Sequence, residues 1–194
     1  MLALLAACAI GVAAPHEVPP PDDPAPALTA LGPQPRGATA LTLLAGRPMN
    51  SVRVDHGFGE AADAGLGLDI SRRGNVRPVL RGRVRAFRFS GLQLGLRGAL
   101  GTLIVRTAGV LRTVDAELGL QLAYAPLARL AAFADVALLA ATDFTREHSA
   151  GFAQAQAGLA FAPPGPFSLL ASAGVLQGSR GRRAIGSGGV AFRF

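Results

Sequence analysis

Regular alternation of apolar and polar side chains is the feature that most restricts how this 194-residue chain can fold. The clearest stretch is Val114–Tyr124, where one set of alternate positions is apolar and the other carries Asp115, Glu117 and Gln121. Successive side chains of a β-strand point to opposite faces, so a period of two predicts strands with one apolar and one polar face. Residues 66–71, 92–97, 152–161 and 188–194 repeat the pattern. The sequence therefore predicts an all-β fold.

The environment of these strands follows from the overall hydrophobicity. Half of the residues are hydrophobic, yet beyond the first positions no apolar run reaches the roughly 18 residues of a transmembrane helix. A sheet closed on itself is the other structure that can cross a bilayer. A soluble β-sandwich would show the same alternation with its apolar face inward, and the apolar window Leu127–Ala141 could alternatively form a buried helix. Long strands and a polar face rich in Gly, Gln and charges favour an antiparallel, up-and-down transmembrane β-barrel.

The first 37 residues differ in character from the rest. Residues 1–14 form an apolar run that ends in small residues, as a signal peptide does. Leu5-Ala6-Ala7-Cys8 also matches the lipobox of bacterial lipoproteins, so Cys8 is a candidate for lipidation, with ordinary cleavage near Ala14 as the alternative. Residues 15–37 are rich in proline, which removes backbone donors, and we expect an extended, disordered linker there. The barrel is expected over residues 38–194.

The length of residues 38–194 accommodates eight strands with turns and modest loops. Ten strands are the alternative, if Ala99–Val110 forms a strand of its own, since single-chain barrels favour even numbers. Short breakers at Ala125–Ala128 and Ala162–Pro166 alternate with longer polar links at Asp143–Ala150 and Gly178–Arg183. We therefore expect short turns at one end of the barrel and longer loops at the other.

The chain ends in Gly188–Phe194, with a terminal Phe and apolar residues at every second position before it. This end resembles the last strand of bacterial outer-membrane β-barrels. The resemblance covers the residue pattern of 38–194 rather than close sequence identity. It implies an outer-membrane location and recognition of Val190, Phe192 and Phe194 by the barrel assembly machinery. One departure is that the chain has no Trp and one Tyr, so phenylalanines would have to form the aromatic girdles at both membrane interfaces.

The polar faces of the predicted strands carry most of the charges that are candidates for a function. Confined charges must be paired or solvated, so we expect an internal ion-pair network. A narrow anion-selective pore lined by Arg81, Arg83 and Arg85 is the alternative. Residues 74–89 are difficult to assign, because their arginines do not keep one face throughout, namely Arg77, Arg81, Arg83, Arg85 and Arg88. The residues expected to point into the lumen are Asp69, Arg81, Arg83, Arg85, Arg97, Asp115, Glu117, Asp135 and Arg193.

No spacing of His, Cys and acidic residues predicts a metal site, and no motif predicts a catalytic centre or a cofactor. The net charge is +7 and all 19 basic residues are Arg, but they are scattered, which disfavours nucleic acid as a partner. Arg180, Arg182 and Arg183 could contact lipopolysaccharide phosphates, or form a solvated loop. We expect a monomeric, non-enzymatic outer-membrane barrel with a structural or surface-interaction role, surrounded by membrane lipids. A small anion-selective channel and a lipidated periplasmic β-sandwich are the alternatives.

Overall fold

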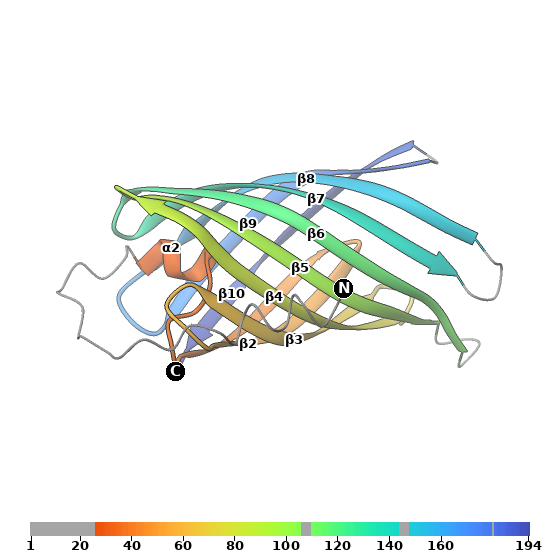
Figure 1. The fold of residues 1–194 in the computed structure, drawn as a ribbon, viewed down its shortest axis with the longest axis horizontal. Helices are drawn as coiled ribbons and strands as arrows, with labels where there is room; N and C mark the ends of the chain where they lie inside the picture. The colour runs from red at the N-terminus through yellow and green to blue at the C-terminus, as the bar shows by residue number, and fades with distance from the viewer. Residues whose placement is uncertain (1–25, 106–109, 144–147, 180) are drawn as a thin grey trace.

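The computed structural model describes residues 26–105, 110–143, 148–179 and 181–194. Their strands form one closed antiparallel barrel in which each strand pairs with its neighbours in sequence and β1 pairs with β10 (Figure 1). The predicted up-and-down β-barrel is thus confirmed, and the β-sandwich alternative is wrong. The elements are α2 (Pro26–Leu31), β1 (Thr39–Arg47), β2 (Met49–Gly57), β3 (Ala62–Ser71), β4 (Val76–Phe89), β5 (Leu92–Val105), β6 (Val110–Leu127), β7 (Leu130–Asp143), β8 (His148–Phe161), β9 (Phe167–Gly178) and β10 (Gly181–Arg193).

The barrel has ten strands rather than the preferred eight. The separate strand considered at Ala99–Val110 does not exist, because residues 99–105 complete β5 and Val110 begins β6. Ten strands fit because the links between them are short. Pro48 alone connects β1 to β2, and Ala128 and Arg129 connect β6 to β7. Residues that an eight-stranded barrel would place in loops therefore belong to the hydrogen-bonded ladder.

Side chains alternate between the two faces of the barrel as predicted, with apolar residues outside and charged residues inside. Leu66 and Leu138 on the outer face are 67% and 69% exposed, whereas Asp55 and Asp135 on the inner face are each 2% exposed. Large apolar side chains are exposed on every strand from β1 to β9. A barrel folded for water would have the opposite arrangement. The buried helix considered at residues 127–141 is wrong, since most of that window forms β7.

The arginines of β4, which the sequence pattern could not assign to one face, are explained by a β-bulge. Arg83 pairs with Arg97 and Arg85 pairs with Gly95, but the next pair is Phe87 with Leu94. A bulge inserts one unpaired residue and so changes which positions face inward. Arg88 pairs with the buried Gln93 and therefore returns to the inner face that the earlier arginines of β4 occupy.

The two ends of the barrel differ in chemistry rather than in loop length. The proximal end holds Phe194 and the links after β2, β4, β6 and β8, and the distal end holds the links after the odd-numbered strands (Figure 1). The expected difference in loop length is absent. The link expected at Gly178–Arg183 shrinks to two residues, because β9 ends at Gly178 and β10 begins at Gly181. One of the two-residue proximal turns is Ser90-Gly91, with φ of 46° and 79°. Positive φ at both positions is typical of two-residue hairpins, and glycine adopts it without strain.

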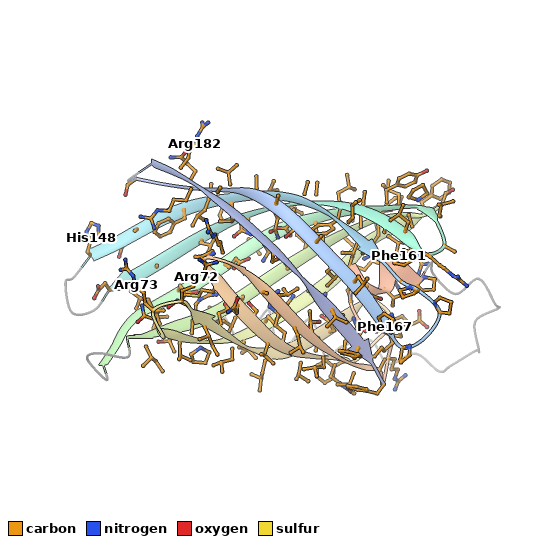
Figure 2. All side chains as sticks on the ribbon, turned by 180° about the vertical axis from the view of Figure 1, so that it is seen from behind. Arg72, Arg73, His148, Phe161, Phe167 and Arg182 are labelled. Atoms are coloured by element: carbon orange, nitrogen blue, oxygen red, sulfur yellow. The ribbon has the colours of Figure 1, made fainter. Side chains whose placement is uncertain are left out.

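Outward-facing aromatic residues lie at the proximal end throughout the described part of the chain, so the structure has one aromatic girdle where two were expected. Figure 2 shows Phe161 and Phe167 at this end and Arg72, Arg73, His148 and Arg182 at the other. The ring centroids of Phe167 and Phe192 are 6.5 Å apart. The girdle consists of Phe58, Phe87, Phe89, Tyr124, Phe161, Phe167, Phe192 and Phe194.

The proline-rich segment is folded where the structure describes it, so the expected disordered linker is wrong for residues 26–37. Pro26 begins α2, at a position where a missing backbone N–H costs nothing. Ala27, Leu28 and Leu31 of this helix are buried. The signal peptide, Cys8 and the rest of the linker lie outside the described residues. Among the residues that are described, no helix is long and apolar enough to cross a membrane.

Candidate functional site

The barrel interior contains the densest group of charged side chains, and Arg77 of β4 is one of its centres. Its Nη1 lies 2.8 Å from Oδ2 of Asp69 on β3, and its Nε lies 2.9 Å from Oδ2 of Asp115 on β6. Ser51 of β2 donates a hydrogen bond of 2.5 Å to the other oxygen of Asp69. One arginine thereby joins carboxylates from two other strands along the inner wall.

A second centre is Arg97 of β5. Its Nε and Nη2 each lie 2.6 Å from a different oxygen of Asp135 on β7, and its Nη1 pairs with Glu117 on β6. The two parallel contacts to Asp135 form the bidentate geometry that makes Arg–carboxylate pairs strong. The Asp135 side chain is 1% exposed, so Arg97 supplies the compensating charge that its burial requires.

The three arginines considered as a pore ladder are engaged in contacts with the wall. Arg81 Nε lies 3.4 Å from Oδ1 of Asp55, and Arg83 Nη2 lies 2.5 Å from Oδ2 of Asp63. Arg85 Nη2 donates a hydrogen bond of 2.6 Å to the backbone oxygen of Glu60. These contacts direct the guanidinium groups toward neighbouring strands, and a free cationic ladder along the lumen is therefore absent from the described residues.

All nine residues expected in the lumen lie on the inner face of the barrel. Seven of them belong to the ion pairs described above, Arg85 binds a backbone oxygen, and Arg193 is half-buried opposite Ala40. On β2, on β3 and on β4 up to its bulge, sequence reasoning missed four further charged members of the inner face. Their signal was present, since Val52 and Val54 alternate with two of them. The missed residues are Arg53, Asp55, Asp63 and Arg77.

Glycines on the inner face make room for the bulky arginine pairs. A Cβ added at Gly101 would lie 2.8 Å from Nε of Arg77, and one added at Gly119 would lie 3.1 Å from Nε of Arg97. Both distances are shorter than ordinary van der Waals contact. The ion pairs therefore explain why glycines are frequent on the polar face, since the guanidinium groups occupy volume that larger side chains would take.

The proximal mouth of the barrel is filled by the segment that contains α2. Leu28 is 1% exposed and packs with inner-wall alanines of β6, β7 and β8, among them Ala123, Ala131 and Ala160 (Figure 1). The mouth is thus closed by apolar packing against small side chains. We call residues 26–37 the plug.

Two hydrogen bonds join the plug to the charge network. The backbone N–H of Gln34 donates to Oδ2 of Asp63 over 2.9 Å, and Nη1 of Arg83 donates to the backbone oxygen of Leu31 over 3.3 Å. Asp63 and Arg83 also pair with each other. The plug and the network therefore form one continuous packed unit inside the barrel.

A cavity of about 250 Å³ opens at the distal mouth, on the inner side of β8, β9 and β10. Phe152 and Leu176 supply apolar walls, and His148 and Arg183 supply polar ones. Its position at one mouth, together with the plug at the other, leaves the charge network in the middle of the lumen.

Asp55 and His56 are adjacent in the sequence but do not form a site. Asp55 is buried in the lumen, whereas His56 is exposed on the outer face, where its Nδ1 lies 2.9 Å from Oγ1 of Thr39. Ser51, which lies on the same strand, bonds to Asp69. In the ranges that the structure describes, no group of three His, Cys or acidic residues is placed to hold a metal ion.

No protein-family model and no curated protein sequence matches this chain. Several solved barrels resemble it in shape. The outer membrane protein OmpT of Vibrio cholerae, in a form lacking loop L8, aligns at 14% identity over 75% of this chain and 53% of its own, with a TM-score of 0.41. This chain therefore spans about half of that protein's length.

Two shorter structures align over nearly their whole length. The porin KdgM, solved in complex with disordered oligogalacturonate, aligns at 9% identity over 81% of this chain and 99% of its own, with a TM-score of 0.44. Ail, the attachment invasion locus protein of Yersinia pestis, aligns at 15% identity over 82% of this chain and 99% of its own, with a TM-score of 0.27. These identities and TM-scores are too low for any property of those proteins to be carried to this chain.

Proposed function

We propose that this chain is an integral outer-membrane barrel protein with a non-enzymatic, structural or surface-interaction role. The observation that carries the proposal is the inverted polarity of the closed barrel. Every strand from β1 to β9 exposes large apolar side chains, while the carboxylates of the lumen are buried and paired. In lipid, a closed ring of strands satisfies all backbone hydrogen bonds, and the apolar outer face meets hydrocarbon instead of water.

The proximal end would face the periplasm. Phe194 exchanges backbone hydrogen bonds of 3.0 Å with Thr39, so the terminal strand closes the ring. Val190 and Phe192 lie on its outer face, where the barrel assembly machinery could recognise them together with Phe194. The aromatic girdle at this end would anchor the barrel at the periplasmic interface, and the distal end would then face the outside of the cell.

The lumen favours a closed barrel over the small anion-selective channel. The plug fills the proximal mouth, and the four arginines of β4 before its bulge contact carboxylates or backbone oxygens. A conducting anion path needs cationic groups that can exchange partners with passing ions. The proposed structural or surface-interaction role would then be carried out at the two membrane surfaces. The chain would act there as a monomer without a cofactor.

Heat modifiability tests the proposal. Full-length protein in the outer-membrane fraction is analysed by electrophoresis in cold detergent, before and after boiling. We expect the unboiled protein to migrate differently, because a closed ladder resists detergent until it is heated. A variant lacking residues 181–194 cannot pair β1 with β10 and should show no difference. Equal mobility of the unboiled and boiled full-length protein would contradict the barrel in the membrane.

Planar-bilayer recording of the folded protein separates the two roles. A closed lumen predicts no steady current at any applied voltage. A steady, anion-selective current would refute the closed lumen and establish the channel instead.

A further inference from the structure

Three exposed arginines gather on two neighbouring hairpin turns at the distal end of the barrel. Arg47 ends β1, immediately before the Pro48 link. Arg72 and Arg73 begin the link from β3 to β4 (Figure 2). The β2–β3 ladder ends with Met49 paired to Ser71, which places the two turns side by side. We call Arg47, Arg72 and Arg73 the arginine patch.

The turn that carries two of these arginines has a defined conformation. The backbone N–H of Ser71 donates to the oxygen of Asn75 over 2.9 Å, and the N–H of Gly74 donates to the oxygen of Ser71 over 2.9 Å. Oγ of Ser71 accepts a further hydrogen bond of 3.0 Å from the N–H of Asn75. The turn therefore holds the backbone of Arg72 and Arg73 at its tip, so the two side chains leave the barrel from a fixed position.

In the described part of the chain, the guanidinium groups of the patch have no carboxylate as a partner. Among the described residues, no Asp or Glu lies within ion-pairing distance of Arg47, Arg72 or Arg73. Most of the described carboxylates are buried in the lumen. At the distal end, Asp143 is the last residue of β7. The described residues at the tips of these two turns therefore form a cationic surface, although the network inside the barrel is largely neutralised.

The depth of the patch matches the headgroup layer of a membrane. Ile70 is the last exposed apolar residue of β3, and Arg72 follows it by two positions. A strand rises about 3.3 Å per residue and barrel strands are tilted by roughly 40°, so Arg72 lies about 5 Å beyond Ile70 along the membrane normal. The headgroup region adds about 5–7 Å to each side of the hydrocarbon core. The arginines therefore reach the level at which the headgroups of the distal leaflet carry their charge.

We infer that the arginine patch binds the phosphate groups of a phosphorylated glycolipid, of the lipid A type, in the outer leaflet. Arginine forms bidentate hydrogen bonds to phosphate, and neighbouring arginines can share one or two phosphates of a single headgroup. Aromatic residues anchor the opposite end, so the two ends are suited to different leaflets. The inference rests on the proposed function, because it requires the barrel to stand in an asymmetric membrane.

The test measures how lipid A protects the folded protein from heat. Full-length protein in neutral detergent micelles is titrated with diphosphorylated lipid A, and the temperature at which half of the heat-modifiable band is lost is recorded. Wild-type protein should be stabilised in a saturable way. Arg72→Gln/Arg73→Gln should raise the half-saturating lipid concentration about thirtyfold, since each arginine near an anionic lipid surface contributes roughly fivefold. Arg72→Lys/Arg73→Lys should give an intermediate value.

The matched control is Arg36→Gln/Arg129→Gln, which removes two exposed charges from the proximal end and should titrate as the wild type does. Equal weakening by both Gln pairs, or no weakening by the distal pair, overturns the inference. Sodium phosphate at the same phosphate concentration should neither stabilise the protein nor compete with lipid A. Competition would overturn the inference, because it would show that the patch binds a free anion rather than a lipid. Absence of a heat-modifiable band is a failure of the proposed function, whereas a normal band that lipid A does not stabilise is a failure of this inference alone.

Discussion

Replacing Arg97 by Met should strongly destabilise the barrel, because Arg97 is the partner of a carboxylate that has almost no access to solvent. Asp135 accepts two hydrogen bonds of 2.6 Å from Arg97, and its side chain is 1% exposed. Glu117, the second partner, is 11% exposed. Removing one member of a buried pair leaves the other charge uncompensated and costs about 3–5 kcal/mol. Methionine keeps much of the volume of arginine, so the loss measures charge and hydrogen bonding rather than a cavity.

The free energy of unfolding is measured by urea titration in lipid vesicles, with the fraction of heat-modifiable band as the readout. Arg182→Met is the matched control, because Arg182 is exposed and its neutral partner is Oε1 of Gln177 at 2.8 Å. That control should change the free energy of unfolding by less than about 0.5 kcal/mol.

A double-mutant cycle separates the pair from its surroundings. Asp135→Asn removes the buried charge, so Arg97→Met/Asp135→Asn should lose at least about 1 kcal/mol less than the sum of the two single changes. A loss below about 1 kcal/mol for Arg97→Met alone would mean that the pair contributes no more than a solvent-exposed salt bridge does, and it would refute the reasoning.

Three further changes test other parts of the structure. Leu28→Asp puts a charge at a 1% exposed position of the plug and should lower the free energy of unfolding by about 3–5 kcal/mol. The heat-modifiable band should persist, and its complete loss would contradict the expectation that the barrel wall forms without the plug. Gly101→Val should displace Arg77 and cost about 1–3 kcal/mol in the urea titration, whereas Gly151→Val, which has open space around it, should cost less than about 0.5 kcal/mol. Phe194→Ala should reduce the amount of heat-modifiable protein in the outer membrane several-fold, with Phe58→Ala as a control that leaves it unchanged, and equal amounts for both would remove Phe194 from the assembly signal.

The alternation of side chains predicted most of the barrel wall. In Val114–Tyr124 the period of two identified β6, its outer face and the inward carboxylates Asp115 and Glu117. This works because the two faces of a membrane barrel meet different surroundings, so each position carries a chemical preference. The same pattern failed at β4, since a bulge after Arg85 shifts the register by one residue and composition gives no sign of it.

Contacts that depend on the register of three strands could not be predicted. Arg77 pairs with Asp69 on a neighbouring strand and also with Asp115 on β6. The register of β4, β5 and β6, with Gly101 between the two side chains, brings the second pair within reach. The proline-rich segment was misread for a related reason. Proline content excludes residues 26–37 from a ladder, but it does not prevent Leu28 from packing against alanines that lie about a hundred residues later. The number of strands depended on link lengths, which a sequence sets only loosely.

The plug has a consequence for the order in which the chain folds. A helix of six residues is far too short to persist alone in water, so α2 must form while it docks. Its docking surface combines Ala131 and Ala160 with Asp63 and Arg83, and these residues lie on strands that span most of the sequence. That surface is complete only after these distant strands have assembled. Docking of α2 is therefore a late event in folding. Protection of its amides from hydrogen exchange would indicate that the strands of that molecule have assembled into the complete barrel wall.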